Sequence, residues 1–339
     1  MKCEEKKSKI RGGNACAMNQ RGMQRLTQIL IAAIGSVRIK LLLLVGLAFV
    51  LFGFTGCLTH LMGWKNLDPK SDPFAGTGYS ILINTWKRYD LLKKSVAHYS
   101  ACGGLDSIHI VWSEPNPPAN SLVKYLTHIV ETKSDSRRQV ELVFDINKED
   151  SLNNRFRPVE LKHDAVFSID DDVIFPCSSV EFAFNVWRSA PDTMVGYVPR
   201  VHWIETPQDA KSKLYTYGGW WSVWWTGTYS MILSKAAFFH KKYLHIYTNE
   251  FPASIRNYIT KNRNCEDIAM SFLVANLTGA APIWVQGKIF EIGSTGISSL
   301  GGHQDKRTHC VNRFVAEFGR MPLVPTSVKA VDSRSTWFW

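Results

Sequence analysis

The stretch that decides the fold is Val166-Phe167-Ser168-Ile169-Asp170-Asp171-Asp172-Val173-Ile174-Phe175. An apolar run leads into three consecutive carboxylates and then resumes, and its β-branched and aromatic residues are typical of a buried strand. Three acids are unfavourable there unless they lie at the end of the strand, where a positive partner neutralises them. Mg²⁺ or Mn²⁺ binds hard carboxylate oxygens and often shares its remaining positions with phosphate, and open α/β sheets bind ligands beyond the carboxyl ends of their strands. The stretch therefore predicts a metal site that holds a phosphorylated substrate, with an acidic turn between two strands as the simpler alternative.

The composition of the chain allows a large core. Its 339 residues are enough for one large domain or two small ones. It is 45% hydrophobic and 20% charged, so most of it can fold into a globular structure. The formal net charge is +11, but many of the cations belong to the first forty residues. We therefore infer no nucleic-acid binding from the charge, and the sequence contains no DNA- or RNA-binding signature and no tandem repeat.

A long apolar run near the N-terminus predicts a membrane anchor. Residues 41–58 carry no charge, and residues 59–64 can extend the run to about 20 residues or more, the length of a spanning helix. Cations lie on its N-terminal side, so the tail should be cytosolic and the rest of the chain lumenal. A cleaved signal peptide has a shorter apolar region and leader, and a mitochondrial targeting peptide lacks such a run. We predict a single-pass type II membrane protein with a disordered basic cytosolic tail (1–40), an uncleaved signal anchor (41–63), a stem (64–78) and a lumenal domain (79–339).

Two features agree with a lumenal domain. Asn276-Leu277-Thr278 is an N-glycosylation sequon, which is used only in the secretory lumen. Cys102, Cys177, Cys265 and Cys310 would face an oxidising compartment, where disulfides form. The chain has no CxxC pair, so a zinc site has little support. At this stage Cys102 and Cys177 either pair with each other or stay buried and free.

The order of the predicted elements indicates an α/β fold. Short apolar strands over 81–83, 108–112 and 140–144, with a helix over 91–99 after the first, predict a parallel nucleotide-binding sheet. Periodicity predicts further helices over 178–189, 235–247, 253–260, 268–275 and 310–318. It predicts further strands over 194–198, 214–217, 229–233 and 283–285. Residues 293–302, rich in Gly and Ser, are expected to form a mobile loop that can cover a site.

One predicted loop is unusually aromatic. It reads Gly218-Gly219-Trp220-Trp221-Ser222-Val223-Trp224-Trp225. Tryptophan combines a large apolar ring with an N–H donor, so it suits a buried core, a platform for sugar rings or a membrane interface. The sequence leaves all three alternatives open.

A series of separated blocks carries a more specific signal. The blocks are Ile83-Asn84-Thr85-Trp86-Lys87-Arg88, Asn154-Arg155-Phe156, Asp170-Asp171-Asp172, Val195-Gly196-Tyr197-Val198-Pro199-Arg200, Tyr215-Thr216-Tyr217-Gly218-Gly219, Tyr229-Ser230-Met231, Asn264-Cys265-Glu266-Asp267-Ile268-Ala269-Met270 and Arg307-Thr308-His309-Cys310-Val311-Asn312. In this order they resemble the exostosin-like glycosyltransferases, glycosyltransferase family 64, across essentially the whole lumenal domain. A triple-acid motif alone is weak evidence, whereas the ordered blocks are specific.

The resemblance implies a GT-A fold, an α/β nucleotide-sugar-binding fold with a mixed, mostly parallel sheet flanked by helices. It also implies a nucleotide-sugar donor, Mn²⁺ or another divalent cation, and retention of the anomeric configuration. Asp170, Asp171 and Asp172 resemble the family's DXD element, with Asp172 in direct contact with the metal. The other positions that match donor-binding residues are Asn84, Arg88, Asn154 and Arg155.

Two further pairs follow from the resemblance. Asp267 and Arg307 match the residues with catalytic roles. Cys265 and Cys310 match a disulfide that would hold the Arg307 loop close to Asp267. Arg307 and a metal ion can neutralise charge on the leaving diphosphate, and Asp267 can stabilise an oxocarbenium-like sugar or orient the acceptor. Whether Asp267 is a nucleophile or an electrostatic support stays open, and a front-face, same-side displacement is our hypothesis because no second carboxylate is clearly placed.

The sequence constrains the donor and acceptor specificity of the protein less than it constrains the family. Residues 220–225 and the segment before Arg307 depart from animal members, so the animal heparan activities are not transferred. The chain is most similar to short, single-domain plant members. That resemblance implies a Golgi membrane mannosyltransferase that uses GDP-mannose and acts on the glucuronic-acid head of glycosyl inositol phosphorylceramides. The alternative is a UDP-N-acetylhexosamine transferase acting on a cell-wall, glycoprotein or proteoglycan glycan. A homo-oligomer is compatible with either.

Two rival functions lie outside this family. Asp170 to Val173 also match the first four positions of the D-x-D-x-[TV] element of haloacid dehalogenase-type phosphatases, with Asp170 as nucleophile and Asp172 as acid. That element normally follows the first strand, whereas here it comes about ninety residues into the domain. The other rival is a membrane-anchored lectin or a catalytically silent partner, which the aromatic loop would serve. Intact Asp172, Asp267 and Arg307 argue against it.

Overall fold

The computed structural model describes residues 12–63, 76–135, 138–205, 214–293 and 302–335. Its first unit contains one helix, α1 (Gly12–Gly63), in which Gly35–Cys57 is long and apolar enough to cross a membrane. The helix extends through residues 12–40, where the sequence predicts a disordered tail. No proline interrupts this region, and its Met, Gln, Leu and Ala residues favour helix. Most of the predicted stem, residues 64–75, lies outside the described residues.

The second unit, residues 74–339, is built around a large sheet. Within the described residues its strand order is β13-β11-β6-β10-β4-β1-β2-β3. Every strand runs parallel to its neighbours except β10, which is antiparallel to β4 and β6. This confirms the predicted mixed, mostly parallel sheet. The strand bounds are β1 (Tyr79–Thr85), β2 (Leu105–Trp112), β3 (Glu141–Ile146), β4 (Ala165–Asp170), β6 (Val195–Gly196), β10 (Ala236–His240), β11 (Ile283–Val285) and β13 (Lys329–Ala330).

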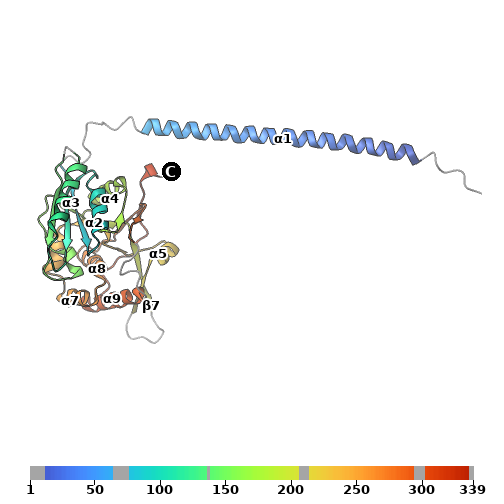
Figure 1. The fold of residues 1–339 in the computed structure, drawn as a ribbon. Helices are drawn as coiled ribbons and strands as arrows, with labels where there is room; N and C mark the ends of the chain where they lie inside the picture. Colours follow the sequence, from blue (N-terminus) through green and yellow to red (C-terminus); the bar gives the residue numbers. More distant parts are fainter. Residues whose placement is uncertain (1–11, 64–75, 136–137, 206–213, 294–301, 336–339) are drawn as a thin grey trace, which may run out of the picture. The chain divides into compact units, whose positions relative to one another are not determined.

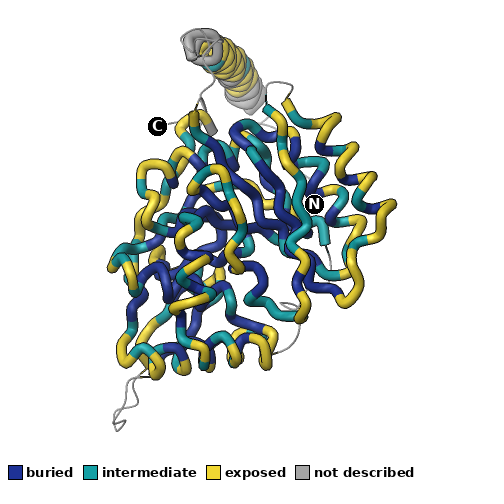
Figure 2. Tube along the Cα trace, turned by 90° about the vertical axis from the view of Figure 1, so that its left-hand side faces the viewer, coloured by how far each residue is buried: buried dark blue, intermediate teal, exposed yellow. Residues whose placement is uncertain are grey.

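Helices cover both faces of this sheet (Figure 1). One face packs against α2 (Tyr89–Tyr99), α3 (Asn120–Lys133) and α4 (Cys177–Ser189). The other packs against α6 (Lys242–Asn249), α7 (Ala253–Asn262), α8 (Glu266–Thr278) and α9 (His303–Phe318). Figure 2 shows the central strands as the most buried part of the chain. The sequence analysis predicts no helix at α3.

Alternation along the strands divides the core into two clusters. On β1, Ile81 and Ile83 contact the cluster beneath α2, while Leu82 contacts the one beneath α8. On β4, Val166 and Phe167 are divided in the same way. All five are at most 1% exposed, and burying one such side chain contributes about 1.5–3 kcal/mol. The apolar runs thus produce a sheet that is covered on both faces.

Two predicted elements are wrong in type. The helix expected over 235–247 is divided into strand β10 and helix α6. Phe238 and Phe239 face opposite cores, and an apolar run of this kind cannot be assigned to helix or strand by periodicity. The aromatic loop is instead a short helix, α5 (Trp220–Thr226). The last helix, α9, begins at His303, earlier than predicted.

Two small antiparallel sheets extend the central one. One has the order β8-β7-β9, with β7 (Pro199–Glu205), β8 (Leu214–Gly218) and β9 (Met231–Ile232). The other pairs β5 (Val173–Ile174) with β12 (Phe290–Glu291). Short 3₁₀ helices complete the described elements, η1 (Leu152–Phe156) and η3 (Ser333–Ser335). Residues 294–301 of the predicted mobile loop lie outside the described residues.

Candidate active site

The three consecutive acids lie where the sequence predicts, at the carboxyl end of a central strand. Asp170 is the last residue of β4 and is in register with Asn84 near the end of β1. From β1 the chain continues to β2 and β3 on one side, and β4 lies on the other. Such a switch in strand order leaves a crevice at the strand ends, which is the usual ligand site of an α/β sheet.

Asp171 and Asp172 share one arginine. Arg88, directly before α2, forms ion pairs with Asp171 and with Asp172, the second over 2.8 Å between Nη1 and Oδ2. Asp171 is fully buried and its Oδ2 accepts a 2.7 Å hydrogen bond from the Thr85 hydroxyl. Burial raises the pKa of Asp171 to about 6, although the Thr85 hydrogen bond and the Arg88 charge act in the opposite direction. Asp172 is 21% exposed at its side chain and therefore faces outward from this edge.

A glycine lies directly against Asp172. The Ile292 N–H donates to the Asp172 carbonyl oxygen at 2.8 Å, and the next residue is Gly293. A Cβ added to Gly293 would lie 2.8 Å from the Cβ of Asp172, closer than real Cβ contacts. The position therefore requires glycine because the backbone crosses the acidic residue so closely.

Asp267 and Arg307 form a second, buried pair. Asp267 is in the first turn of α8, as predicted, and is 3% exposed. Its Oδ2 accepts a 2.8 Å hydrogen bond from Arg307 Nη2, and its Oδ1 accepts one from the Ile268 N–H. Arg307 also donates to the Tyr217 hydroxyl at 2.9 Å. Burial acts to raise the pKa of Asp267, but the Arg307 charge and hydrogen bond outweigh it and hold that pKa below its usual value.

A disulfide holds the two helices of this pair together. Cys265, directly before α8, is bonded to Cys310 in α9. Arg307 lies in α9 and not in a loop, and Cys310 follows it by one turn. Cys265 has a φ of 77°, a left-handed conformation that is costly for a non-glycine residue and is often found at functional sites. The other disulfide, Cys102–Cys177, joins α4 to the segment after α2.

Arg155 connects the two groups of acids. It is 3% exposed, forms an ion pair with Asp170, and interacts electrostatically with Glu266 and Asp267. Burial raises the pKa of Glu266, and the neighbouring Asp267 charge raises it further. Among the described residues the Nε–H groups of Arg155 and Arg307 are buried without a hydrogen-bond partner. Buried donors of this kind are unfavourable, and they are the groups that an anionic ligand can engage after a local rearrangement.

We call this whole region the acidic edge: Asp170, Asp171, Asp172, Glu266 and Asp267, with Arg88, Arg155 and Arg307. When all are ionised, this named set carries two more negative than positive charges. Its donors are carboxylate oxygens, the ligands that Mg²⁺ and Mn²⁺ prefer, and a divalent cation would balance the excess charge. The residues present therefore fit the predicted metal, with Asp170 and Asp172, 25% and 21% exposed at their side chains, as the two accessible members of the three consecutive acids.

The two predicted donor-binding asparagines, Asn154 and Asn84, lie in different surroundings. Asn154 is 4% exposed, and both of its amide hydrogens are used, toward Ser113 and the Glu149 carbonyl oxygen. Its side chain therefore ties η1 to the end of β2. Asn84 lies beside Asp170 at the strand ends. The sequon residue Asn276 lies in the last turns of α8, where its amide oxygen accepts a hydrogen bond from Arg320. Its glycosylation stays a prediction.

The sequence analysis gave no role to three residues that belong to the acidic edge or contact it. Tyr217 orients Arg307, Thr85 orients Asp171, and Glu266 adds a carboxylate beside Arg155. All three lie inside or next to the sequence blocks that carry the family resemblance, and this position was a signal of function. Their contacts, however, depend on strands and helices that are distant in sequence.

Comparison with known proteins agrees with this geometry. Residues 79–337 match the Glycosyl transferase family 64 domain. The chain belongs to glycosyltransferase family 64. It is a glycosyltransferase, and the family match covers the sheet and both helical layers.

Three relatives show how the similarity is distributed. The chain is 64% identical over 330 residues to Glycosylinositol phosphorylceramide mannosyl transferase 1 of Arabidopsis thaliana, covering 96% of this chain and 97% of that protein. It is 35% identical over 273 residues to human Exostosin-2, covering 78% of this chain but 34% of that protein. It is 36% identical over 186 residues to bovine Exostosin-1, covering 52% of this chain and 24% of that protein. The Arabidopsis relative is thus similar over its whole length, the exostosins over about a third of theirs or less.

Proposed function

We propose that this family 64 enzyme transfers mannose from GDP-mannose to the head of a glycosyl inositol phosphorylceramide in the Golgi membrane. The observation that carries the proposal is 64% identity, over nearly the full length of both chains, to a relative named for mannosyl transfer to this lipid class. α1 contains a candidate spanning segment, which suits a type II Golgi enzyme with a lumenal catalytic unit. The phosphatase and the silent-lectin alternatives lose their support because the chain is a family 64 glycosyltransferase.

The acidic edge provides the groups that donor binding needs. Arg88 and Arg155 lie beside the acids, and Asp172 is a partly exposed carboxylate that would contact Mn²⁺ or another divalent cation. A bound cation supplies positive charge that compensates the diphosphate of the donor. Arg307, held by Asp267 and Tyr217, adds a fixed cation that stabilises the negative charge of the leaving group.

Asp267 suits electrostatic support better than nucleophilic attack. Both of its oxygens are engaged, one by Arg307 and one by the Ile268 N–H. Its lowered pKa keeps it ionised and makes it a weak base. In a front-face displacement the acceptor hydroxyl oxygen forms a bond to the sugar C1 while the bond from C1 to the phosphate oxygen breaks. GDP leaves with that electron pair and accepts the hydroxyl proton. The configuration is then retained without a covalent enzyme intermediate, and trapping a glycosyl–Asp267 adduct would contradict this assignment.

A donor panel tests the proposal. The purified full chain is incubated in detergent with GDP-mannose, UDP-N-acetylglucosamine and UDP-N-acetylgalactosamine, with and without Mn²⁺, and release of the nucleoside diphosphate is measured. We expect Mn²⁺-dependent release of GDP from GDP-mannose, lost in Asp172→Ala and retained in Asp192→Ala. Asp192 is the matched control because it is a surface carboxylate paired only with Lys242 among the charged groups described.

The other outcomes are equally informative. Cleavage of a UDP-sugar alone would keep the family and overturn the proposed donor. Release of GDP without any cation would overturn the metal assignment. Transfer of mannose to a lipid without an inositol phosphate head, but not to a glycosyl inositol phosphorylceramide, would overturn the acceptor.

A further inference from the structure

Three tryptophans on α5 are left uncovered by the described part of the chain. Trp221, Trp224 and Trp225 are 76%, 62% and 82% exposed, whereas Val223 on the same helix is 1% exposed. Spacings of three and four residues place the three rings on one helix face. Core packing, one of the alternatives that the sequence left open, is therefore wrong for these three residues.

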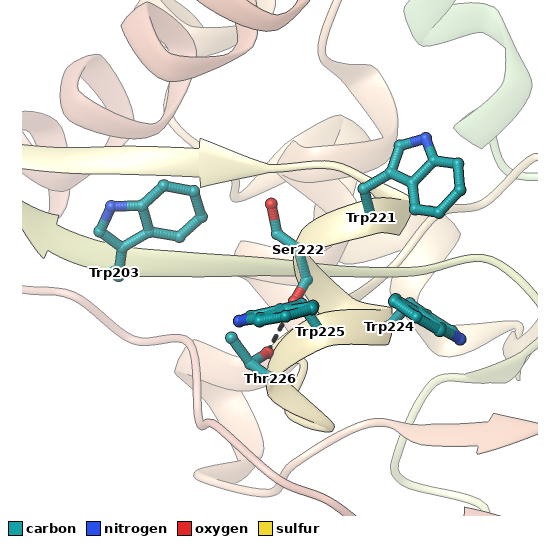
Figure 3. A pocket seen from close by; sticks show the side chains of 6 residues that line it. All are labelled: Trp203, Trp221, Ser222, Trp224, Trp225 and Thr226. Atoms are coloured by element: carbon teal, nitrogen blue, oxygen red, sulfur yellow. Dashed lines mark hydrogen bonds between the residues drawn. The ribbon is translucent and has the colours of Figure 1, made fainter.

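A neighbouring strand extends the same surface. Trp203 on β7 is 40% exposed, and its ring lies across an open hollow from the α5 side chains (Figure 3). The hollow has a volume of about 470 Å³ and is lined by Trp203, Trp221, Ser222, Trp224, Trp225 and Thr226. We call these four tryptophans the tryptophan surface. Contiguous apolar surface of this kind on a folded unit marks an interaction site, since covering it is favourable by roughly 25 cal/mol per Å².

The lining argues against a sugar as the occupant. A sugar site combines aromatic stacking with polar groups that fix the ring hydroxyls. The polar side chains that line this hollow are Ser222 and Thr226, and the Thr226 hydroxyl already donates to the Ser222 carbonyl oxygen at 2.8 Å. The lining set contains no carboxylate, amide or guanidinium group. The surface is therefore suited to an apolar partner with a polar boundary.

The chain itself supplies such a partner. Gly35–Cys57 is a candidate spanning segment, and residues 64–78 connect α1 to β1. Even fully extended, that connection reaches about 50 Å. The six residues of α1 after Cys57 add about 9 Å, so the start of β1 is held within about 60 Å of a bilayer, at a high effective concentration. Indole rings prefer the boundary between acyl chains and headgroups, where the ring is apolar and the N–H is solvated.

We propose that the tryptophan surface docks onto the lumenal leaflet of the membrane in which α1 is anchored. The side chains of Trp221, Trp224 and Trp225 lie in the headgroup region, and Trp203 widens the contact. α5 begins three residues after Tyr217, whose hydroxyl binds Arg307. Docking therefore holds the rim of the active site close to lipid headgroups. That docking serves a lipid acceptor rests on the proposed function, whereas docking itself does not.

Fluorescence quenching measures the contact directly. The full chain is placed in nanodiscs of phosphatidylcholine or of its acyl-brominated form, as wild type and as Trp221→Ser/Trp224→Ser/Trp225→Ser. Subtracting the variant from the wild type isolates the emission of the three rings and removes the other tryptophans, including Trp64. We expect brominated lipid to reduce this difference signal at least twofold. An equal difference signal in both lipids would overturn the proposal. If the triple variant does not fold, Trp225→Ser alone gives the same readout.

Transfer kinetics separate docking from sugar binding. The triple variant should lose about tenfold or more in transfer to a membrane-embedded lipid acceptor, with unchanged donor hydrolysis and unchanged transfer to the soluble headgroup glycan. Tyr125→Ser, which removes a 47% exposed ring on α3, is the matched control and should change neither. Equal losses with lipid and soluble acceptors would replace the proposal with a sugar-binding surface. No loss with either acceptor would overturn the role in acceptor access. If no mannose is transferred to any acceptor, the proposed function fails while the quenching result stands.

Discussion

The acidic edge places charged side chains inside the fold, whereas the tryptophan surface places apolar side chains on its outside. At the acidic edge, charged groups are buried or partly buried, and among the described residues Arg88, Arg155 and Arg307 each pair with a carboxylate. On α5, apolar rings are exposed, and the described residues leave them largely uncovered. Burying a charge is expensive unless it is paired, whereas exposing an indole costs less. The charges of the acidic edge are therefore neutralised mainly by other residues of the fold. The tryptophan surface, in contrast, can be covered only by a partner outside it.

The largest expected effect is at the proposed cation ligand of the acidic edge, Asp172. Asp172→Ala should reduce Mn²⁺-dependent release of GDP from GDP-mannose by at least about a thousandfold, since it removes the carboxylate that we assign to the cation. The melting temperature should change little because Asp172 is partly exposed. Activity assays and thermal melting of the full chain check both parts. Activity within tenfold of wild type would show that Asp172 is not the cation ligand.

Breaking the buried pair should reduce stability most. Asp267→Ala leaves Arg307 charged and without its carboxylate, so we expect a loss of about 3–5 kcal/mol. The double variant Asp267→Asn/Arg307→Gln removes both charges and should be more stable than the single one, although inactive. Urea unfolding of the three proteins measures this. If Asp267→Ala were as stable as the wild type, the Asp267–Arg307 pair would not be buried as described.

The two disulfides allow an effect on protein stability to be separated from an effect on the position of Arg307. Removing either pair by Cys→Ser should cost about 2–4 kcal/mol. Only loss of Cys265–Cys310 should also reduce the rate of donor hydrolysis, by about tenfold, because it frees α9 and Arg307 from α8. Cys102–Cys177 is the matched control. Equal kinetic effects of the two pairs would contradict a positioning role.

The smallest expected effect is a pH dependence of stability. Burial and the Asp267 charge raise the pKa of Glu266 above 4.5, its ordinary value. The folded state therefore keeps this proton to higher pH than the unfolded state, and stability should fall as pH rises from about 4.5 toward neutrality. Melting temperatures between pH 4.5 and 8 should show that fall, and Glu266→Gln should flatten it. An unchanged slope in the variant would place the titration elsewhere.

The sequence predicted the location of the acidic edge more reliably than its contacts. Asp170 to Asp172 interrupt an apolar strand, so their place at a strand end follows from local physics, and the ordered blocks predicted the Cys265–Cys310 pair by resemblance. The pairing of Arg155 with Asp170 and of Tyr217 with Arg307 joins elements distant in sequence. Such contacts are set by tertiary packing, which local pattern does not encode.

The same limit explains the errors in secondary structure. β10 is apolar on both faces, so its pattern resembled a helix, and the sequence analysis joined it to α6. The tryptophans of α5 were compatible with core packing because tryptophan is highly buried on average. Only the fold shows that Val223 alone fills the core at this helix. The sequence pattern therefore identifies the apolar segments, but it does not predict which of their residues the fold leaves exposed.

The central claim is that the acidic edge binds a nucleoside diphosphate together with a divalent cation. Calorimetric titration of GDP into the full chain, in detergent and with or without Mn²⁺, tests it most directly. We predict saturable binding with Mn²⁺, at least about tenfold weaker binding without it, and loss of the Mn²⁺ effect in Asp172→Ala. Binding of equal strength with and without the cation, or an undiminished Mn²⁺ effect in the variant, would contradict the claim.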